Sequence, residues 1–262
     1  PSPYGSGNGV NYASHWDTEL GIRVIDEVYV DVVPWLGQAA TYGPSIPWVY
    51  YEADPVNTAN GNYAFQRTDL SIPTRSFPLA LTRSYNSAVP QAGPLGYGWT
   101  HSYHTYVAVE TPGQVATVYY GDGRSERYVW DGSRYAAPPG SFGELVETSG
   151  AYRLTQKDGT VLQFDAAGRL ASLSDRNGNN TNLSYDAQGR LTLVSEPAGR
   201  TLTFAYASPI STTLVSSVTD PLGRVISYGY DGNADLVSVT DATGAVTTLT
   251  YDANHRLLTL TD

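Results

Sequence analysis

The sequence predicts an all-β protein built from stacked antiparallel hairpins, and three observations support this fold class. Residues that favour strands and turns are abundant, with 21 Tyr and 26 Gly, whereas only 15% of residues are charged. From residue 164 onward an aromatic residue recurs about every 21 residues. Turns of the form acidic-x-x-Gly separate short segments with alternating apolar side chains. Because one hairpin cannot bury its own apolar face, successive hairpins must stack into a growing sheet.

The first 53 residues predict a linker followed by an isolated strand. Residues 1–9 are rich in Pro, Gly and Ser, and residues 22–33 form a β-branched run with apolar side chains on both faces. No turn signal pairs this run with a neighbour, so we expect its partner to be distant in this chain or in another chain. The candidate intersubunit strand comprises Ile22, Val24, Val28, Val30 and Val32. A short helix over residues 14–27 is the alternative, although Gly21 and the β-branched residues disfavour it.

Two ladders with the same period define a repeat in the C-terminal half. The aromatic ladder, with intervals of 21, 21, 24 and 21, comprises Phe164, Tyr185, Tyr206, Tyr230 and Tyr251. The acidic ladder, with intervals of 21, 24, 21 and 21, comprises Asp175, Glu196, Asp220, Asp241 and Asp262. Both ladders absorb one three-residue insertion, which must lie within residues 207–213. A chance match would not keep its register across an insertion.

Acidic residues are expected to cap the turns between strands, because a carboxylate at position i accepts backbone N–H groups and Gly at i+3 adopts a positive φ. The predicted turn caps are Asp165, Asp175, Asp186, Glu196, Asp220, Asp231, Asp241 and Asp252. At two caps the Gly is replaced, by Ala234 and by His255. There we expect looser or strained turns, with Asn233 or Asn254 in the left-handed conformation.

Alternation along the strands predicts one buried face. In the strands that lead to the aromatic ladder, this face comprises Thr181/Leu183/Tyr185, Leu202/Phe204/Tyr206, Ile226/Tyr228/Tyr230 and Thr247/Leu249/Tyr251. In the return strands it comprises Thr192/Val194, Val237/Val239 and Leu258/Leu260.

Several segments resemble a known family. Residues 185–191, 230–236 and 251–257, each beginning Tyr-Asp, resemble the YD repeats of Rhs proteins. Upstream, in order, residues 54–57, 61–63, 68–73, 78–86 and 96–101 resemble the domain that opens the repeat region of bacterial Rhs proteins. We therefore divide the chain into a linker and isolated strand segment (1–53), an Rhs opening or cap domain (54–156) and YD repeats (157–262). The cap is expected to seal the first edge of the sheet.

The resemblance implies a β-sheet that spirals into a hollow shell, which encloses an effector in Rhs toxins and serves adhesion in teneurins. We expect a non-catalytic structural module that associates with itself or with neighbouring parts of a longer Rhs chain. About five units are too few to close a shell, and the array stops at Asp262 within a hairpin. Adding the strand at residues 22–33 to an open edge at residues 257–261 would propagate a filament. The alternatives are an adhesion or carbohydrate-binding module with exposed Tyr and Trp, and an encapsulating shell fragment of a toxin-delivery protein.

The composition argues against several partners and sites. The chain has no Cys, and 15 Lys and Arg against 25 Asp and Glu give a formal charge of −10 at pH 7, so we expect no thiol chemistry and no nucleic-acid partner. No apolar stretch is long enough for a membrane span. No signal peptide is evident, and we expect an extracellular or cell-surface protein whose export signal has been removed.

No catalytic, cofactor or metal site is predicted. His101 and His104 could share a metal only on a helix, and their neighbours favour a strand. Residues 175–179 and 231–235 imitate the start of a calcium loop but lack its Gly and its downstream Glu. Neither a Gly-x-Ser-x-Gly motif nor a phosphate-binding loop occurs. A hydrolase with an unrecognised site is the enzyme alternative.

Overall fold

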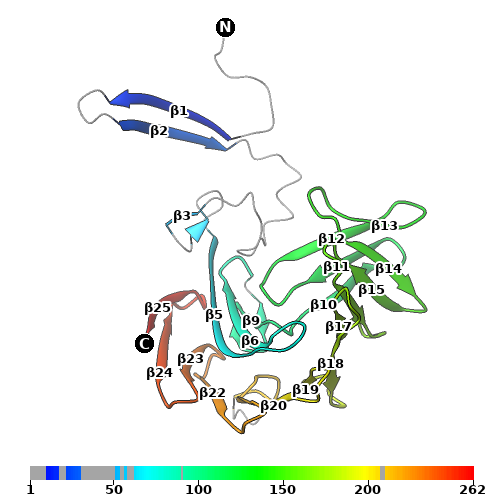
Figure 1. Cartoon of the computed structure of the whole chain (residues 1–262). Helices are drawn as coiled ribbons and strands as arrows, with labels where there is room; N and C mark the ends of the chain where they lie inside the picture. Colours follow the sequence, from blue (N-terminus) through cyan, green and yellow to red (C-terminus); the bar gives the residue numbers. More distant parts are fainter. Residues whose placement is uncertain are drawn as a thin grey trace. The chain divides into compact units, whose positions relative to one another are not determined.

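The computed structural model describes residues 10–17, 22–30, 51–53, 56–57, 62–89, 91–206 and 210–262, with side chains described from residue 62 onward. These residues form strands and turns without a helix, which confirms the predicted all-β class (Figure 1). No helix with the length and apolar character of a membrane span occurs among them. The chain divides into two compact units, Pro1–Ala40 and Thr41–Asp262.

The first unit contains an antiparallel hairpin of β1 (Val10–Asp17) and β2 (Ile22–Val30). Val10 pairs with Val30, and a register shift follows Ala13. The expected isolated strand is therefore wrong, as is the alternative of a helix. The strand β1 escaped prediction because it carries few β-branched residues, so it has no clear strand pattern of its own. The candidate intersubunit residues up to Val30 lie in β2, and Val32 lies outside the described residues.

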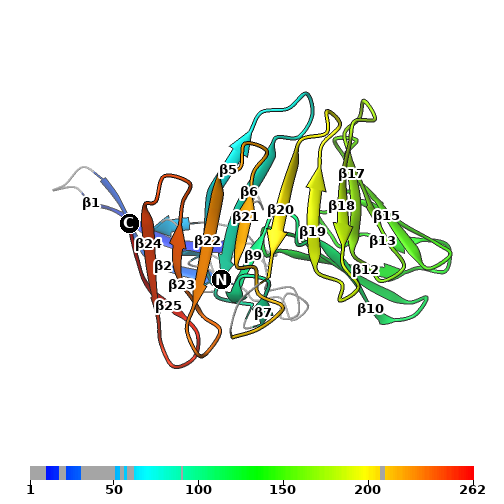
Figure 2. The same cartoon turned by 90° about the horizontal axis from the view of Figure 1, so that it is seen from below.

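Most of the second unit is one antiparallel sheet of 16 strands, in which every strand pairs with its neighbours in sequence order (Figure 2). This order confirms the predicted stack of hairpins. The strands are β10 (Tyr106–Thr111), β11 (Val115–Tyr119), β12 (Ser125–Trp130), β13 (Tyr135–Ala136), β14 (Glu144–Thr148), β15 (Ala151–Thr155), β16 (Val161–Phe164), β17 (Leu170–Ser174), β18 (Asn180–Tyr185), β19 (Leu191–Ser195), β20 (Thr201–Ala205), β21 (Ser217–Thr219), β22 (Val225–Tyr230), β23 (Leu236–Thr240), β24 (Val246–Tyr251) and β25 (Leu257–Thr261). The sheet thus begins inside the segment predicted to be a cap.

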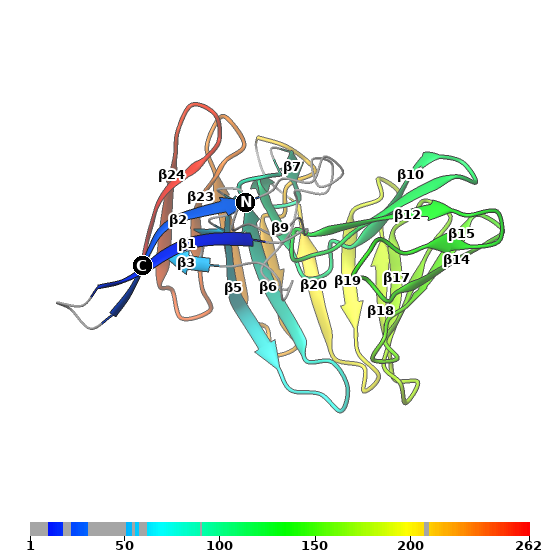
Figure 3. The same cartoon turned by 90° about the horizontal axis from the view of Figure 1, so that it is seen from above.

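Two smaller sheets precede the long one. One has five strands, in the order β3 (Tyr51–Ala53), β4 (Val56–Asn57), β5 (Asn62–Ile72), β6 (Leu79–Asn86) and β9 (Trp99–His101). The other is a short hairpin of β7 (Ala92–Gly93) and β8 (Gly96–Tyr97). We call β5, β6 and β9 the opening strands; they lie on the inner side of the curve formed by the long sheet (Figure 3).

The strands that lead to the aromatic ladder bury the predicted face. Leu183, Leu202, Phe204, Tyr228 and Leu249 are all buried, and Leu202 is fully inaccessible. Alternation at a period of two therefore predicted these side chains correctly.

The return strands depart from strict alternation because each contains a bulge. Tyr185 pairs with Leu191 while Ser184 pairs with Leu193, so Thr192 is an extra residue. The bulge places Leu191 and Val194, three positions apart, in the core. Equivalent register shifts occur at the starts of β23 and β25. The predicted inward positions Thr192, Val237 and Leu258 are consequently wrong, and Leu258 is 64% exposed.

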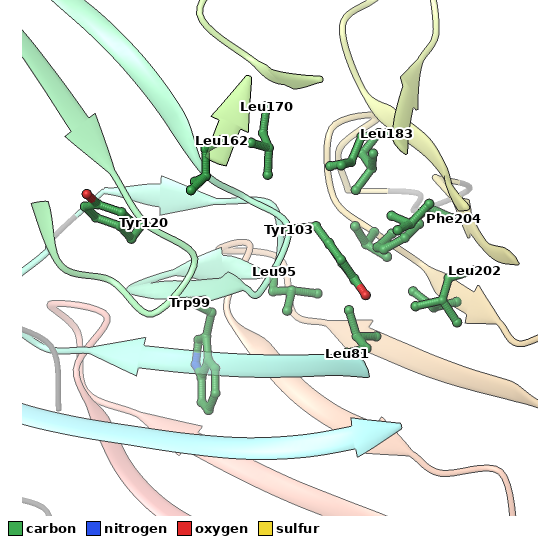
Figure 4. Close-up of a cluster of buried hydrophobic side chains, with 14 of the residues drawn as sticks. Leu81, Leu95, Trp99, Tyr103, Tyr120, Leu162, Leu170, Leu183, Leu202 and Phe204 are labelled. Atoms are coloured by element: carbon green, nitrogen blue, oxygen red, sulfur yellow. The ribbon is translucent and has the colours of Figure 1, made fainter. Parts of the chain in front are cut away.

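One hydrophobic core joins the opening strands to the long sheet. Figure 4 shows side chains from both parts in a single cluster, among them Leu81, Leu95, Trp99, Tyr103, Leu183, Leu202 and Phe204. Leu81, Leu95 and Trp99 are each 1% exposed. The opening strands therefore cover the apolar face that the hairpins alone would leave in water.

We expect Leu202→Ala to lower the free energy of unfolding by about 2–5 kcal/mol, because it opens a cavity at a fully buried position. Thr203→Ala is the matched control, since Thr203 is exposed on the opposite face of β20. Urea denaturation of the full chain measures both variants. Equal, small effects at the two positions would show that the face is assigned wrongly.

Candidate functional site: the repeat turns and the docked opening strands

The aromatic ladder links each repeat to the one before it. In four repeats the tyrosine hydroxyl donates a hydrogen bond to the backbone carbonyl 15 residues upstream. The pairs are Tyr185 to Leu170 at 2.8 Å, Tyr206 to Leu191 at 2.9 Å, Tyr230 to Val215 at 2.7 Å and Tyr251 to Leu236 at 2.8 Å. Phe164 has no hydroxyl group and is buried in the core. Each ring thus packs on the core while its hydroxyl group satisfies a carbonyl of the preceding hairpin.

The predicted caps occupy equivalent places in their turns. Oδ1 of Asp186 accepts hydrogen bonds from the backbone N–H groups of Gln188 and Arg190, at 3.0 and 2.9 Å. The other aspartate caps make the same pair of bonds, and Glu196 accepts from the N–H of Arg200. The carboxylate therefore satisfies turn N–H groups that the strands do not use.

The turns without glycine keep this geometry. Ala234 and His255 themselves adopt positive φ values of 66° and 62°, and their N–H groups bond the carbonyls of Asp231 and Asp252 at 3.1 Å, as the glycines do elsewhere. The prediction that Asn233 or Asn254 takes the left-handed conformation is wrong. The hydrogen-bonded turn determines φ at the fourth position, whichever residue is there.

An arginine after the turn glycine joins neighbouring repeats, a feature that our sequence reasoning missed. Nε of Arg190 donates to the Asp186 carboxylate at 2.7 Å, and the guanidinium lies 4.9 Å from the centre of the Tyr206 ring in the next repeat. Arg169 bridges Asp165 and Tyr185 in the same way. The recurring Asp-x-x-Gly-Arg pattern in the sequence was the available signal.

These donors stabilise the charged form of the caps. The side chain of Asn179, together with backbone N–H groups, lowers the pKa of Asp175 to about 2. The backbone N–H of Arg190 and its side chain both donate hydrogen bonds to Asp186, and these bonds lower the pKa of Asp186 below its ordinary value.

The opening strands dock on the last strands of the long sheet. Trp99 donates a hydrogen bond from Nε1 to the Tyr251 hydroxyl at 2.8 Å, and the N–H of Leu257 donates to the Tyr85 hydroxyl at 3.0 Å. Arg67 forms an ion pair with Asp262. The predicted cap segment does pair with the first strand of the predicted repeats, since β15 lies beside β16. The docking of the opening strands on β24 and β25, at the other end of the sheet, was not predicted. Apolar pattern predicts that a segment is buried, but it does not identify the strand that covers it.

A buried charged cluster lies within this docked region. Nε of Arg83 is 3.4 Å from Oδ1 of Asp69, and these two side chains are 1% and 5% exposed. Tyr228, from β22, donates to Oδ2 of Asp69 at 3.0 Å, and Arg83 also lies over the Trp99 ring. Burial raises the pKa of Asp69, against the opposing effect of the Arg83 charge. The cluster thus ties β5 and β6 to β22.

Of the two close histidines, His101 is buried and His104 is half-buried. Burial lowers the pKa of His101 to about 3 and that of His104 to about 4, so both are neutral at physiological pH. His101 packs 5.4 Å from the Phe204 ring, and Nδ1 of His104 lies 3.0 Å from the Thr100 hydroxyl oxygen. The described residues contain no group of three or more His, Asp or Glu side chains that could hold a metal ion.

Two regions of the chain match known family models. The model described as "Domain of unknown function (DUF6531)" matches residues 53–128, and the model described as "RHS Repeat" matches residues 164–201 and 235–262. The chain is an Rhs-repeat protein. Residues 202–234, between the two RHS matches, contain the three-residue insertion and one of the turns without glycine.

Similar proteins include tRNA nuclease WapA of Bacillus subtilis and tRNA3(Ser)-specific nuclease WapA of Bacillus spizizenii. Each is 34% identical over 129 residues, which cover 48% of this Rhs-repeat chain and 5% of the relative. The chain therefore spans about 5% of the length of these relatives. The crystal structure of TcdB2-TccC3-Cdc42 aligns with 77% of this chain and 12% of its own chain, at 12% identity and a TM-score of 0.32.

We expect acid to destabilise the repeat turns of this Rhs-repeat chain. The pKa of Asp175 is about 2 in the fold against an ordinary 3.8, so its stabilising effect is complete above the ordinary value and is lost as the pH falls toward 2. Asp175→Asn keeps an oxygen acceptor at the cap but cannot titrate over this range. Urea midpoints measured from about pH 5 to about pH 2 should fall less steeply for this variant than for the native chain. Identical slopes would contradict the assignment.

We expect Asp69→Ala to destabilise the chain by about 3–5 kcal/mol, because Arg83 would keep its charge in the core without a facing carboxylate. The double variant Asp69→Ala/Arg83→Met removes both charges and should recover much of this loss. Tyr228→Phe controls for the lost hydroxyl contact, at about 1 kcal/mol. Urea denaturation of all three variants tests this coupling, and a double variant no more stable than Asp69→Ala would exclude it.

Proposed function

We propose that this chain is a non-catalytic structural section of a secreted or cell-surface Rhs-type protein. In this proposal the opening strands cover the apolar face of the long sheet, with polar contacts to β22, β24 and β25, and the long sheet forms part of a β-shell or extracellular scaffold. The observation that carries the proposal is the 16-stranded sheet, whose repeated polar side chains cap turns and connect neighbouring hairpins. Its partners would be other copies of the chain or neighbouring parts of a longer Rhs chain.

The structural roles of the polar residues support a section without catalysis. The cap carboxylates accept backbone N–H groups, and the arginines that follow them are bound to those carboxylates. The pKa values of His101 and His104 lie well below 7, so both rings are neutral at physiological pH, and His104 is already in contact with the Thr100 hydroxyl group. A formal charge of −10 also disfavours RNA. We therefore propose that any nuclease site shared with the WapA relatives lies outside this section.

The first alternative is an adhesion or carbohydrate-binding module. A hollow of about 500 Å³ is lined by Tyr106, Tyr185 and Tyr206, together with Arg169 and Arg190. The two guanidinium groups already lie over the Tyr185 and Tyr206 rings, so those ring faces are not open to a sugar. This geometry makes the carbohydrate hypothesis the weaker one.

Two further hypotheses concern assembly. As an encapsulating shell fragment of a toxin-delivery protein, the chain would enclose cargo on the inner side of the sheet. As a filament unit, it would add a strand to the edge of β25, where Leu258 is exposed. One edge of β2 is already paired with β1, so strand addition would have to use the other edge of β2.

The full chain should leave a mixture of tRNAs intact over hours, with and without divalent cations. Gel analysis of the RNA measures this, and a commercial ribonuclease is the positive control. Cleavage that disappears on a single His or Asp substitution would overturn the proposal in favour of an enzyme.

Light scattering and electron microscopy of the same preparation test assembly. Strand addition predicts filaments that disappear when residues 1–33 are deleted. A native chain that stays monomeric at high concentration, or filaments that survive the deletion, would exclude this mode of assembly. The proposed structural role within a longer Rhs chain would not be affected by either result.

A further inference from the structure

Each strand that carries a residue of the aromatic ladder leads into a connection to the next strand. These five successive connections all lie on the same side of the long sheet, where the ladder strands end. The first two, residues 165–169 and 186–190, have the Asp-x-x-Gly-Arg pattern. The next three depart from it. Residues 207–213 contain the insertion, residues 231–235 read Asp-Gly-Asn-Ala-Asp, and residues 252–256 read Asp-Ala-Asn-His-Arg.

The last two of these connections, and Val215 just after the insertion, contact the short hairpin of β7 and β8. The N–H of Val215, just after the insertion, donates to the carbonyl of Pro94 at 2.9 Å. A Cβ atom at Gly96 would lie 2.7 Å from the carbonyl oxygen of Ala234. The departures from the repeat pattern therefore begin where the hairpin makes contact.

The third contact is made by the side chain that replaces a turn glycine. The ring of Tyr97 stacks on the ring of His255, with centroids 3.9 Å apart and an angle of 19° between the planes. A glycine at position 255, as in the first two connections, would offer no ring to Tyr97. The tip residue Leu95 is 1% exposed, so the hairpin is anchored in the core between these contacts.

The surface that contacts the hairpin also includes the residue that replaces the arginine of the Asp-x-x-Gly-Arg pattern. Asp235 occupies the position of Arg169 and Arg190, with a side chain only 3% exposed, and both its carboxylate oxygens lie 3.0 Å from Nδ1 of His255. Asp235 thus orients the ring on which Tyr97 stacks. An arginine here would remove the acceptor for His255.

Ala234 and His255 occupy positive φ angles that glycine adopts without strain. If the turn glycines had been replaced by neutral drift, there would be no reason for Ala234 and His255 to lie at the two turns that contact the hairpin. The strained residues are instead the ones that contact Gly96 and Tyr97.

We propose that the β7–β8 hairpin and these three connections form a register key. This name denotes Pro94, Gly96 and Tyr97 on the hairpin, with Val215, Ala234, Asp235 and His255 on the repeats. The key selects the one place along a nearly periodic array where the opening strands dock. A shift by one repeat toward the start of the array would put Ala234, which has no ring, opposite Tyr97 in place of His255. The inference rests on the proposed structural function and specifies its internal partner.

The test converts both turns to the repeat pattern, with Ala234→Gly, Asp235→Arg and His255→Gly in the full chain. The control, Ala245→Arg, introduces an arginine after a turn glycine at an exposed position on the opposite side of the sheet, where residues 241–245 read Asp-Ala-Thr-Gly-Ala. Hydrogen exchange followed by mass spectrometry reports on the opening strands and, as an internal reference, on β18 and β19.

A register key predicts that amides of β6 and β9 exchange at least about tenfold faster in the triple variant, while β18, β19 and the control are unchanged. Simple drift predicts that exchange in β6 and β9 stays equal or becomes slower, because glycine removes the strain of a positive φ at both turns. Equal or slower exchange would overturn the proposal.

Tyr97→Ala provides a second arm that leaves the repeat turns intact. It should accelerate exchange in β6 and β9 of the native chain and add little in the triple variant, since the stacking partner is already gone. Fully additive effects would show that Tyr97 and the turns act independently, which also overturns the key. Failure of the structural function would instead appear as RNA cleavage, which none of these variants is expected to introduce.

Discussion

The carboxylate that begins each turn is the interaction on which the rest of the repeat depends. It accepts two backbone N–H groups within four residues and so holds the chain in a tight reversal with a positive φ at the fourth position. The bulge that follows places Leu191 and Val194, rather than their alternating neighbours, in the core. The same carboxylate binds an arginine that covers the next aromatic ring. One local hydrogen-bond pattern thus sets strand length, register and contact between repeats.

A sheet made this way has an apolar face that it cannot cover itself, and the opening strands supply the cover. They do so with buried polar links as well as with leucines. Trp99 and Tyr85 bond Tyr251 and the backbone of Leu257, and the Asp69–Arg83 pair reaches Tyr228. Apolar contact alone would tolerate several positions along the array, whereas hydrogen bonds and buried charges are satisfied in one. Specific docking is therefore concentrated in few polar side chains.

The candidate site could be predicted only in part. The turn caps and the tyrosine ladder were accessible because they recur, and a recurring residue signals a shared local role. The arginines after the turn glycines recur as well, yet their contact with the following ring crosses from one hairpin to the next. The contacts of Asp235, His255 and Tyr97 gave no periodic signal, because each of these residues is an exception within its own segment.

The sequence by itself determined the all-β class, the repeat period, the sites of chain reversal and the buried face of the strands before each aromatic residue. The chain reversals and the buried face depend on residues at most four apart or on alternation along one strand, and the period is visible as a recurrence along the chain, so a linear pattern contains all of them. Only the tertiary structure decided that β2 pairs with β1, that bulges shift the return strands, and that the opening strands cover β22, β24 and β25. Those outcomes depend on geometry and on pairs such as Trp99 and Tyr251, 152 residues apart, whose meeting is settled by the folded sheet and not by any local preference.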